Sequence, residues 1–293
     1  MNQPLFDGGA SSRAFRAVGM VVQRHPGEGS LDPFYVEFIR GLETVLLEAG
    51  INLVVQVRES IEEEIDCYRH WSRTEAVAGV FLVDLQRADA RPGVVRELGL
   101  TAVVLGNPSL GGGFPAVWTD DGSAMRSAVD YLASLGHQQI AHVGGPERLF
   151  HTQERNAAFF DAARVHGMYG RAVHADYTAA GGARETAALL AQPRGNQPTA
   201  IIYDNDLMAL GGRREALDSG YLVPGDISLL AWDDSLRCQR AGLSVLSRDI
   251  AAYGELAAKV LLGGVEGSPD KRLPGEVPHL VVRDTTAPPP LRD

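Results

Sequence analysis

The stretch DGSAMRSAVDYLASLGHQQIAHVGG, residues 121–145, decides the fold class of this chain. Its first part, 121–136, has the apolar spacing of a helix that is closed by Gly136, and a short apolar strand follows at 138–145. A strand that starts directly after a helix is typical of parallel sheets, whose strands are joined by helical connections. The stretch therefore predicts an α/β fold.

The same alternation of strand and helix runs through most of the chain. Further strands are expected at 15–22, 52–57, 77–83, 101–106, 172–176, 199–204 and 227–233, and further helices at 34–50, 154–167, 182–192 and 206–220. Asp32 before Pro33 marks the expected start of the helix at 34–50, and Gly50 marks its end. The strands are near-continuous apolar runs, which indicates parallel sheets with helices on both faces. Because the chain has more strand–helix units than one sheet usually holds, we expect two doubly wound lobes.

Composition limits the class of protein. The chain has 293 residues with 27 basic and 37 acidic side chains, which gives a net charge of −10. Hydrophobic residues make up 45% and charged residues 22%, the balance of a globular chain. No apolar run has the length of a membrane span, and no secretory signal is recognisable. Cys67 and Cys238 cannot build a disulfide framework, so we expect a cytoplasmic protein that is too acidic to bind DNA by itself.

Sequence motifs for catalysis are missing. The chain has no GxxxxGK phosphate loop, no GxGxxG dinucleotide motif and no GxSxG nucleophile elbow. Its eight histidines form no HExxH motif and do not pair with cysteine at metal-ligand spacing. We therefore expect structural histidines, no metal and no cofactor.

Three acidic clusters follow apolar strands: Asp120-Asp121, Asp204-Asn205-Asp206 and Asp233-Asp234. Ligand sites of open α/β sheets lie at the carboxyl ends of the strands, so these clusters are candidates for a site. Two facing carboxylates could also hydrolyse a glycosidic bond. Alternatively, one acid of each cluster caps the following helix. Since nothing else supports catalysis, we expect a protein that is not an enzyme.

Several segments in a fixed order carry a family resemblance. They are VGMVV with DPFYVEFIRGLE (32–43), VAGVFLV (77–83), TDDGSAMRSAVDYLASLGHQQIAHVGGP (119–146), ERNAAFFDAA (154–163), DNDLMALGGRREALDSGYLVPGDISLLAWDD (204–234), LSRDIAAYGELAAKVLL (246–262) and VPHLVVRDTTAPP (277–289). From Ala17 to Pro289 the chain resembles the effector-binding core of the lac repressor (LacI/GalR) family of transcriptional regulators. GHQQIA (136–141) is nearly a signature by itself.

The resemblance implies a periplasmic-binding-protein-like fold, with two lobes joined by three crossings and a small polar effector between them. The crossings are expected near 134–137, 246–250 and 270–277. The expected division is an N-terminal lobe of 16–135 plus 249–271, a C-terminal lobe of 136–248 plus 276–287, and tails at 1–15 and 288–293. The family also implies a homodimer and operator DNA as a partner. Because 1–15 is too short for the DNA-binding headpiece, we expect this chain to lack it.

The resemblance also implies which residues contact the effector. The polar candidates are Asp121, Arg155, Asn205 and Asp233, and the aromatic candidates are Phe34, Tyr35 and Trp232. Five of them have an alternative role. Arg155 could pair with Glu154 or Asp161 on a solvated helix face, and Asp121 and Asp233 could cap helices. Phe34 and Trp232 could belong to the core.

Two residues depart from the family pattern. Arg248 stands where a glutamine is common, and Asp204 stands where a small residue is usual. A second arginine in the site favours a carboxylate or phosphate on the effector. Alternatively, an internal Arg248–Asp204 pair leaves the effector neutral. The loop at 25–31 is longer than usual, so we expect it to cover part of the cleft.

The expected function is allosteric sensing of a sugar or sugar derivative without catalysis. The alternative is a solute-binding receptor for sugar uptake, which would have the same two-lobed architecture. The gene sequence upstream would separate them, because a regulator would carry a helix-turn-helix segment and a receptor an export signal.

Overall fold

The computed structural model describes residues 17–23, 31–263 and 272–290. The described residues form two compact units, the first within the segments 1–119 and 249–276 and the second within 120–248 and 277–293. The chain thus passes between the units at 119–120, 248–249 and 276–277. The expected pair of α/β lobes linked by three crossings is confirmed.

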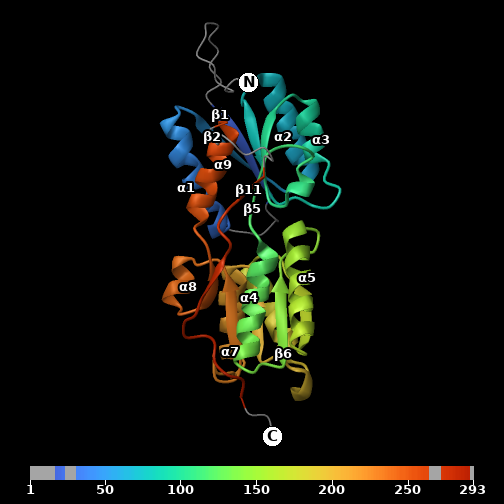
Figure 1. The fold of residues 1–293 in the computed structure, drawn as a ribbon, viewed down its shortest axis with the longest axis vertical. Coiled ribbons are helices and arrows are strands. Elements are labelled where there is room, and N and C mark those ends of the chain that lie inside the picture. The colour runs from blue at the N-terminus through green and yellow to red at the C-terminus, as the bar shows by residue number, and fades with distance from the viewer. Residues whose placement is uncertain (1–16, 24–30, 264–271, 291–293) are drawn as a thin grey trace. The chain divides into compact units, whose positions relative to one another are not determined.

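The first unit has one sheet, covered on both faces. Its elements are strands β1 (Ala17–Gln23), β2 (Asn52–Arg58), β3 (Gly79–Leu82), β4 (Thr101–Leu105), β5 (Ala116–Trp118) and β11 (Arg272–Pro274), helices α1 (Pro33–Glu48), α2 (Ile61–Thr74), α3 (Arg91–Glu97) and α9 (Ile250–Leu261), and the 3-10 helix η1 (Pro108–Leu110). The described strands are parallel, in the order β11-β5-β4-β3-β1-β2. Helices α1 and α9 pack on one face, and α2 and α3 pack on the other (Figure 1).

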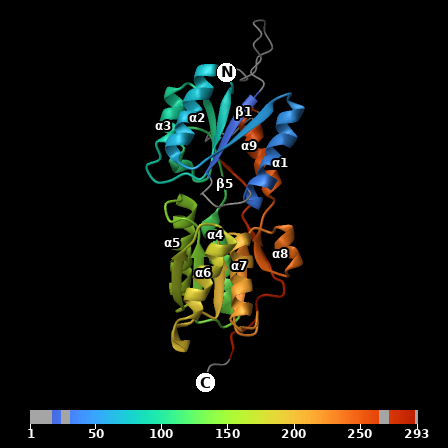
Figure 2. The same cartoon turned by 180° about the vertical axis from the view of Figure 1, so that it is seen from behind.

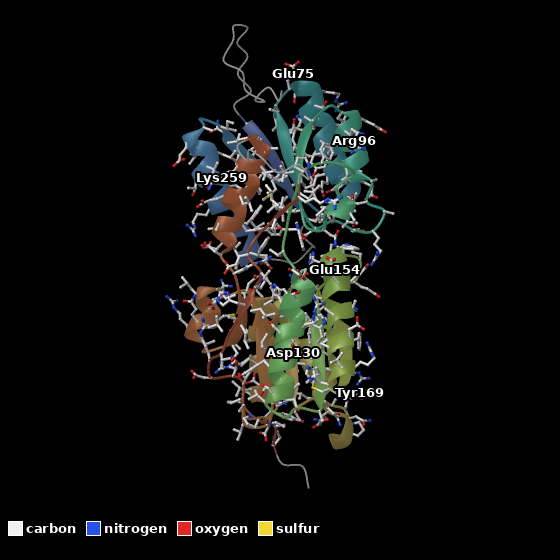
Figure 3. All side chains as sticks on the ribbon, viewed as in Figure 1. Glu75, Arg96, Asp130, Glu154, Tyr169 and Lys259 are labelled. Carbon is white, nitrogen blue, oxygen red and sulfur yellow. The ribbon has the colours of Figure 1, made fainter. Side chains whose placement is uncertain are left out.

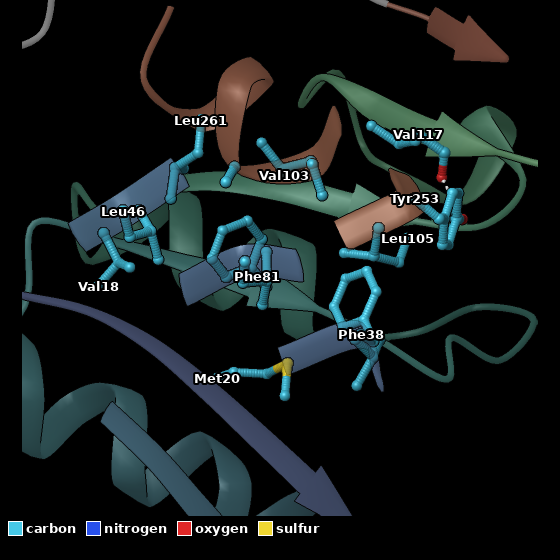
Figure 4. Close-up of a cluster of buried hydrophobic side chains, with 14 of the residues drawn as sticks. Val18, Met20, Phe38, Leu46, Phe81, Val103, Leu105, Val117, Tyr253 and Leu261 are labelled. Carbon is cyan, nitrogen blue, oxygen red and sulfur yellow. Dashed lines mark hydrogen bonds between the residues drawn. The ribbon is translucent and has the colours of Figure 1, made fainter. Parts of the chain in front are cut away.

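An aromatic cluster fixes α1 and α9 over the first sheet (Figure 4). The ring centroids of Phe38 and Tyr253 lie 5.8 Å apart. The Tyr253 hydroxyl donates a hydrogen bond of 2.8 Å to the backbone carbonyl of Val117. Apolar burial and one satisfied hydroxyl thus join α9 to β5.

The second unit repeats this architecture. Its elements are strands β6 (Gln139–Gly144), β7 (Tyr169–His174), β8 (Ala200–Tyr203), β9 (Ser228–Trp232), β10 (Ser244–Ser247) and β12 (His279–Val281), helices α4 (Asp121–Ser134), α5 (Phe150–Val165), α6 (Ala179–Leu190), α7 (Asp206–Asp218) and α8 (Leu236–Arg240), and the 3-10 helix η2 (Arg194–Asn196). The strand order is β12-β10-β9-β8-β6-β7, and only β12 among the described strands is antiparallel to its neighbour. Helices α4 and α5 pack on one face, and α6 and α7 on the other (Figures 1 and 2).

Helix ends follow the sequence signals. The Asp32 side chain accepts a hydrogen bond of 2.8 Å from the backbone N–H of Phe34, and Pro33 is the first residue of α1. Gly50 follows the helix with a φ of 71°, a conformation that glycine adopts without strain. The expected bounds of α1 are therefore confirmed to within two residues. On the outer side of the helices, Asp130 of α4 and Lys259 of α9 are exposed (Figure 3).

The first crossing differs from the expected one. It lies at 119–120 instead of near 134–137, so α4 belongs to the second unit. The reason is packing, because Met125 and Val129 of α4 share a core cluster with Phe159 of α5. The structure also starts α5 at Phe150 and β7 at Tyr169, earlier than expected. The expected tail at 1–15, most of the loop at 25–31 and part of the third expected crossing lie outside the described residues.

Candidate functional site

Polar residues gather at one edge of the second sheet. Gly145 follows β6, Asp204 follows β8, Asp233 follows β9, and Arg248 follows β10. Because these strands are parallel, their carboxyl ends lie at the same edge, where α/β sheets bind ligands. The structure thus places the candidate residues Asp233 and Arg248 at the same sheet edge as Asp204.

Arg155 of α5 occupies the centre of this group. Its Nε and one terminal nitrogen each lie 2.8 Å from Asp121 Oδ2. The other terminal nitrogen lies 3.4 Å from Asp204 Oδ1 and donates to the Asp204 backbone carbonyl at 3.3 Å. Arg155 is only 5% exposed, so the alternative role on a solvated helix face is wrong.

The electrostatics of these three side chains match the geometry. Burial alone would lower the pKa of Arg155, but Asp121 and Asp204 raise it above its ordinary value. Burial alone would raise the pKa of Asp204, but His142 and Arg155 lower it well below the usual range. Arg155 and Asp204 are therefore both ionised at neutral pH.

Trp232 lies beneath Arg155. The guanidinium carbon is 3.7 Å from the centroid of the indole ring. Trp232 is fully buried in the same core cluster as Met125 and Phe159, so it has the core role that the sequence left open. Within the described part of the chain, its indole Nε1 has no hydrogen-bond partner.

Asp233 and Arg248 form a second pair of opposite charges. Arg248 Nε lies 3.5 Å from Asp233 Oδ1, and both side chains are largely buried. Burial raises the pKa of Asp233, although Arg248 and Arg155 counteract this effect. Asp233 also has a φ of 67°, which is unusual for a residue with a side chain and is found at binding sites. The carboxylate that neighbours Arg248 is thus Asp233, in place of the Asp204 expected in the internal pair.

In two of the three acidic clusters, one residue caps the helix that follows. Asp120 caps α4 by accepting the N–H of Ser123 at 2.8 Å, while the adjacent Asp121 binds Arg155. Asn205 caps α7 by accepting the N–H of Met208 at 2.9 Å, and its amide donates to the Tyr177 carbonyl at 3.0 Å. Asn205 therefore holds the local backbone.

Phe34 and Tyr35 lie in α1 of the first unit. The Phe34 ring stacks on Phe38 with centroids 5.7 Å apart and meets the Tyr35 ring edge-on at 5.3 Å. The buried Tyr35 hydroxyl donates to the carboxylate of Asp84, which follows β3 with a φ of 51°. Asp84 is a polar residue at a strand end that the sequence interpretation missed.

Asp204 has further partners that the sequence interpretation also missed. Its carboxylate accepts from the Gly145 N–H at 3.0 Å and lies 2.9 Å from His142 Nε2. His142 was expected to be structural only. Its position inside an apolar strand, two residues before Gly144, is the signal that could have revealed it.

The described residues form neither a metal-holding cluster nor a membrane-spanning helix. In ranges 17–23, 31–263 and 272–290, no three His, Cys, Asp or Glu side chains are arranged to hold a metal ion. Among the helices described, none is both long and apolar enough to cross a bilayer.

Comparisons with known proteins define the class of protein first. Residues 129–286 match the family described as a periplasmic binding protein-like domain. A LacI family transcriptional regulator from Bifidobacterium animalis subsp. lactis is 33% identical, with a TM-score of 0.83 over 94% of this chain and 99% of that one. The complex of the transcriptional regulator CelR with cellobiose is 27% identical, with a TM-score of 0.80 over 92% of this chain and 84% of that one. The fold is thus that of a periplasmic binding protein-like domain.

The relatives in sequence narrow this class to a family. The HTH-type transcriptional regulator AglR of Rhizobium meliloti is 29% identical over 300 residues, which cover 97% of this chain and 81% of AglR. The chain belongs to the LacI family of transcriptional regulators. These relatives are regulators and not enzymes.

Proposed function

We propose that this chain senses a neutral sugar or sugar derivative for a LacI-type transcriptional regulator, in the cytoplasm and as a homodimer. The charge balance at the carboxyl edge of the second sheet carries the proposal. Arg155 already faces Asp121 and Asp204, and Arg248 already faces Asp233. An anionic effector would have to compete with these carboxylates, whereas sugar hydroxyls can donate to them and accept from the guanidinium groups.

The proposed place of the effector is the cleft between the lobes that the family resemblance implies. Asp121, Arg155, Asn205, Trp232, Asp233 and Arg248 are the proposed contacts on the second unit, and Phe34 and Tyr35 those on the first. CelR, one of the similar structures, is a complex with cellobiose, which supports a sugar as effector. Binding would control operator DNA through a headpiece by favouring one lobe arrangement, to the extent that the effector prefers it.

A screen of ligand classes tests this function. Thermal shift and titration calorimetry would compare cellobiose and other neutral sugars with gluconate, glucose 6-phosphate and a nucleoside. We expect binding of a neutral sugar, and a loss of about 1–3 kcal/mol of binding free energy in Asp233→Ala and Arg248→Gln. Asp218→Asn and Arg214→Gln, which change an exposed pair on α7, are the matched controls and should bind as wild type does.

Three results would contradict the proposal. Tighter binding of gluconate or glucose 6-phosphate than of every neutral sugar would reject a neutral effector. Binding that is unchanged in Asp233→Ala would remove Asp233 from the site. Turnover of aryl glycosides that depends on Asp233 would replace sensing by hydrolysis.

A further inference from the structure

A chain of four hydrogen bonds leads from a backbone carbonyl to the buried carboxylate of Asp204. His174 Nδ1 lies 3.0 Å from the Gly145 carbonyl oxygen, and His174 Nε2 lies 3.2 Å from Asn156 Nδ2. Asn156 Oδ1 lies 2.7 Å from His142 Nδ1, and His142 Nε2 lies 2.9 Å from Asp204 Oδ1. These four hydrogen bonds thus link residues of β7, α5 and β6, and the last of them ends next to Arg155.

The number of protons in this chain follows from its two ends. The Gly145 carbonyl and the ionised Asp204 carboxylate can only accept, so His174 Nδ1 and His142 Nε2 must both donate. The Asn156 amide supplies one donor and one acceptor to the two inner bonds, so one further ring N–H must come from a histidine. The four bonds therefore need three ring N–H protons, whereas two neutral imidazoles carry two.

This count does not depend on how the Asn156 amide is oriented. If Nδ2 faces His174, the doubly protonated ring is His142. If the amide is flipped, the doubly protonated ring is His174. In both cases one imidazolium is shared by the pair.

We propose that His142 and His174 together hold one proton more than two neutral rings, and that this proton positions Asp204 and, through it, Arg155. The histidines are positioning residues and not effector contacts. Their consequence for effector affinity rests on the proposed function, since it assumes that Arg155 contacts the effector.

Charge balance supports the extra proton. Asp121 and Asp204 bring two negative charges to Arg155, which supplies one positive charge, and the imidazolium supplies the second. The side chains of His142 and Asp204 are fully buried, so water cannot replace a lost hydrogen bond there. His174 and Asn156 are only partly buried and give the proton a path to solvent.

Other ionisable groups lie around Arg155, where the series of hydrogen bonds ends. Asp121 of α4, Tyr177 after β7, Asp204 after β8 and Asp233 after β9 act on Arg155 of α5, and Asp206 of α7 acts on Asp233. His151 Nε2 lies 2.7 Å from the Tyr177 hydroxyl. Of these groups, only Asp204 contacts His142 directly in the described structure.

Loss of the proton should change the position of Arg155. One of the four hydrogen bonds would then lack a hydrogen, and Asp204 would keep its charge without the imidazolium. Arg155 already lies 3.4 Å from Asp204 Oδ1 and 2.8 Å from Asp121 Oδ2, so a stronger pull from Asp204 would shift it between the two carboxylates.

NMR of protein with ¹⁵N-labelled histidine tests the proton count directly, without an effector. At about pH 7.5, where exposed histidine is mostly neutral, we expect three protonated ring nitrogens on His142 and His174 together. His70, on an exposed part of α2, is the internal reference for a solvent-exposed ring. Two protonated nitrogens on the pair would overturn the proposal.

Two substitutions at His174 separate this role from simple packing. In His174→Gln, the new amide can donate to Gly145 and accept from Asn156, so His142 must stay doubly protonated. In His174→Phe, Asn156 can turn and donate to a neutral His142, so the extra proton is no longer needed. The Arg155 Nε–H resonance should shift with pH in the wild type and in His174→Gln, and stay constant in His174→Phe. Equal pH profiles in all three proteins would also overturn the proposal.

Cellobiose is the probe for the effect on binding. We expect its affinity to fall at least about fivefold as the pair loses its proton at rising pH, and to lose this dependence in His174→Phe. If cellobiose does not bind at any pH, the choice of effector in the proposed function fails, while the NMR result still decides the proton count.

Discussion

The guanidinium carbon of Arg155 lies 3.7 Å from the centroid of the Trp232 ring. Both side chains are buried, and the attraction between a cation and an indole ring is strongest where water is excluded. The edge of the same guanidinium faces Asp121 and Asp204. Arg155 is thus fixed by an aromatic face below and carboxylates at its edge. In the proposed function, this fixed side chain would contact the effector at low entropic cost.

Removal of this guanidinium should destabilise the second unit. In Arg155→Ala, the carboxylates of Asp121 and Asp204 would stay buried without their main cation, and we expect a loss of about 3–5 kcal/mol in the free energy of unfolding. Urea denaturation measures this change. Arg164→Ala on the same helix is the control, because its pair with Asp161 is exposed and should contribute less than about 1 kcal/mol. Equal losses in both variants would show that the buried network adds no special stability.

The ionisation of Asp204 should appear in the pH dependence of stability. The pKa of Asp204 is lowered by His142 and Arg155, so its ionised form stabilises the fold above the ordinary pKa of about 3.9. That contribution disappears as the pH falls through the lowered pKa. We expect Asp204→Asn to be about 3 kcal/mol less stable than wild type at neutral pH, with the gap shrinking below about pH 4.

A matched variant controls for the general effect of acid. Asp218→Asn removes an exposed carboxylate that pairs with Arg214 on the surface of α7, so its stability should follow that of the wild type at every pH. If the difference in unfolding free energy between wild type and Asp204→Asn stayed at about 3 kcal/mol down to pH 2, the charge of Asp204 would not be the source of the stabilisation.

The sequence predicts local features better than long-range pairs. The cap by Asp32, the apolar strands and the strand-end positions of Asp204 and Asp233 all follow from neighbouring residues, and the structure confirms them. The pair His142–Asp204 does not, because it spans 62 residues and exists only in the register that joins β6 to β8. The first crossing was misplaced for a similar reason, since only packing shows that α4 belongs with α5.

A buried group of charged side chains in the first unit is another feature that the sequence analysis did not predict. Arg91 of α3 lies 2.9 Å from Glu64 Oε2 and 2.6 Å from Asp89 Oδ2, and it donates to the backbone carbonyl of Asp84 at 2.9 Å. All three charged side chains have at most 1% exposure. Arg91 therefore holds the backbone that follows β3, where Asp84 accepts the Tyr35 hydroxyl.

A double-mutant cycle would test this buried pair. We expect Arg91→Met to lose about 3–5 kcal/mol of unfolding free energy, because Glu64 and Asp89 would remain buried without a cation. The double variant Arg91→Met with Glu64→Met should lose clearly less than the sum of the single losses. Arg69→Ala, which changes an exposed pair with Asp66, is the control and should stay within about 1 kcal/mol of wild type. Additive losses would show that Arg91 and Glu64 act independently.

The last prediction concerns Gly41, at which α1 packs closely against α9. A Cβ placed on Gly41 would lie 2.0 Å from the Ala251 carbonyl oxygen, a distance that forces the helices apart. We expect Gly41→Ala to destabilise the first unit by about 1–3 kcal/mol in urea denaturation. Gly93→Ala in α3 is the matched control, because its Cβ would meet nothing within 4 Å. It should stabilise the protein by about 0.5–1 kcal/mol, since alanine loses less backbone entropy in a helix. If Gly41→Ala proved as stable as Gly93→Ala, the contact between α1 and α9 would be looser than the structure describes.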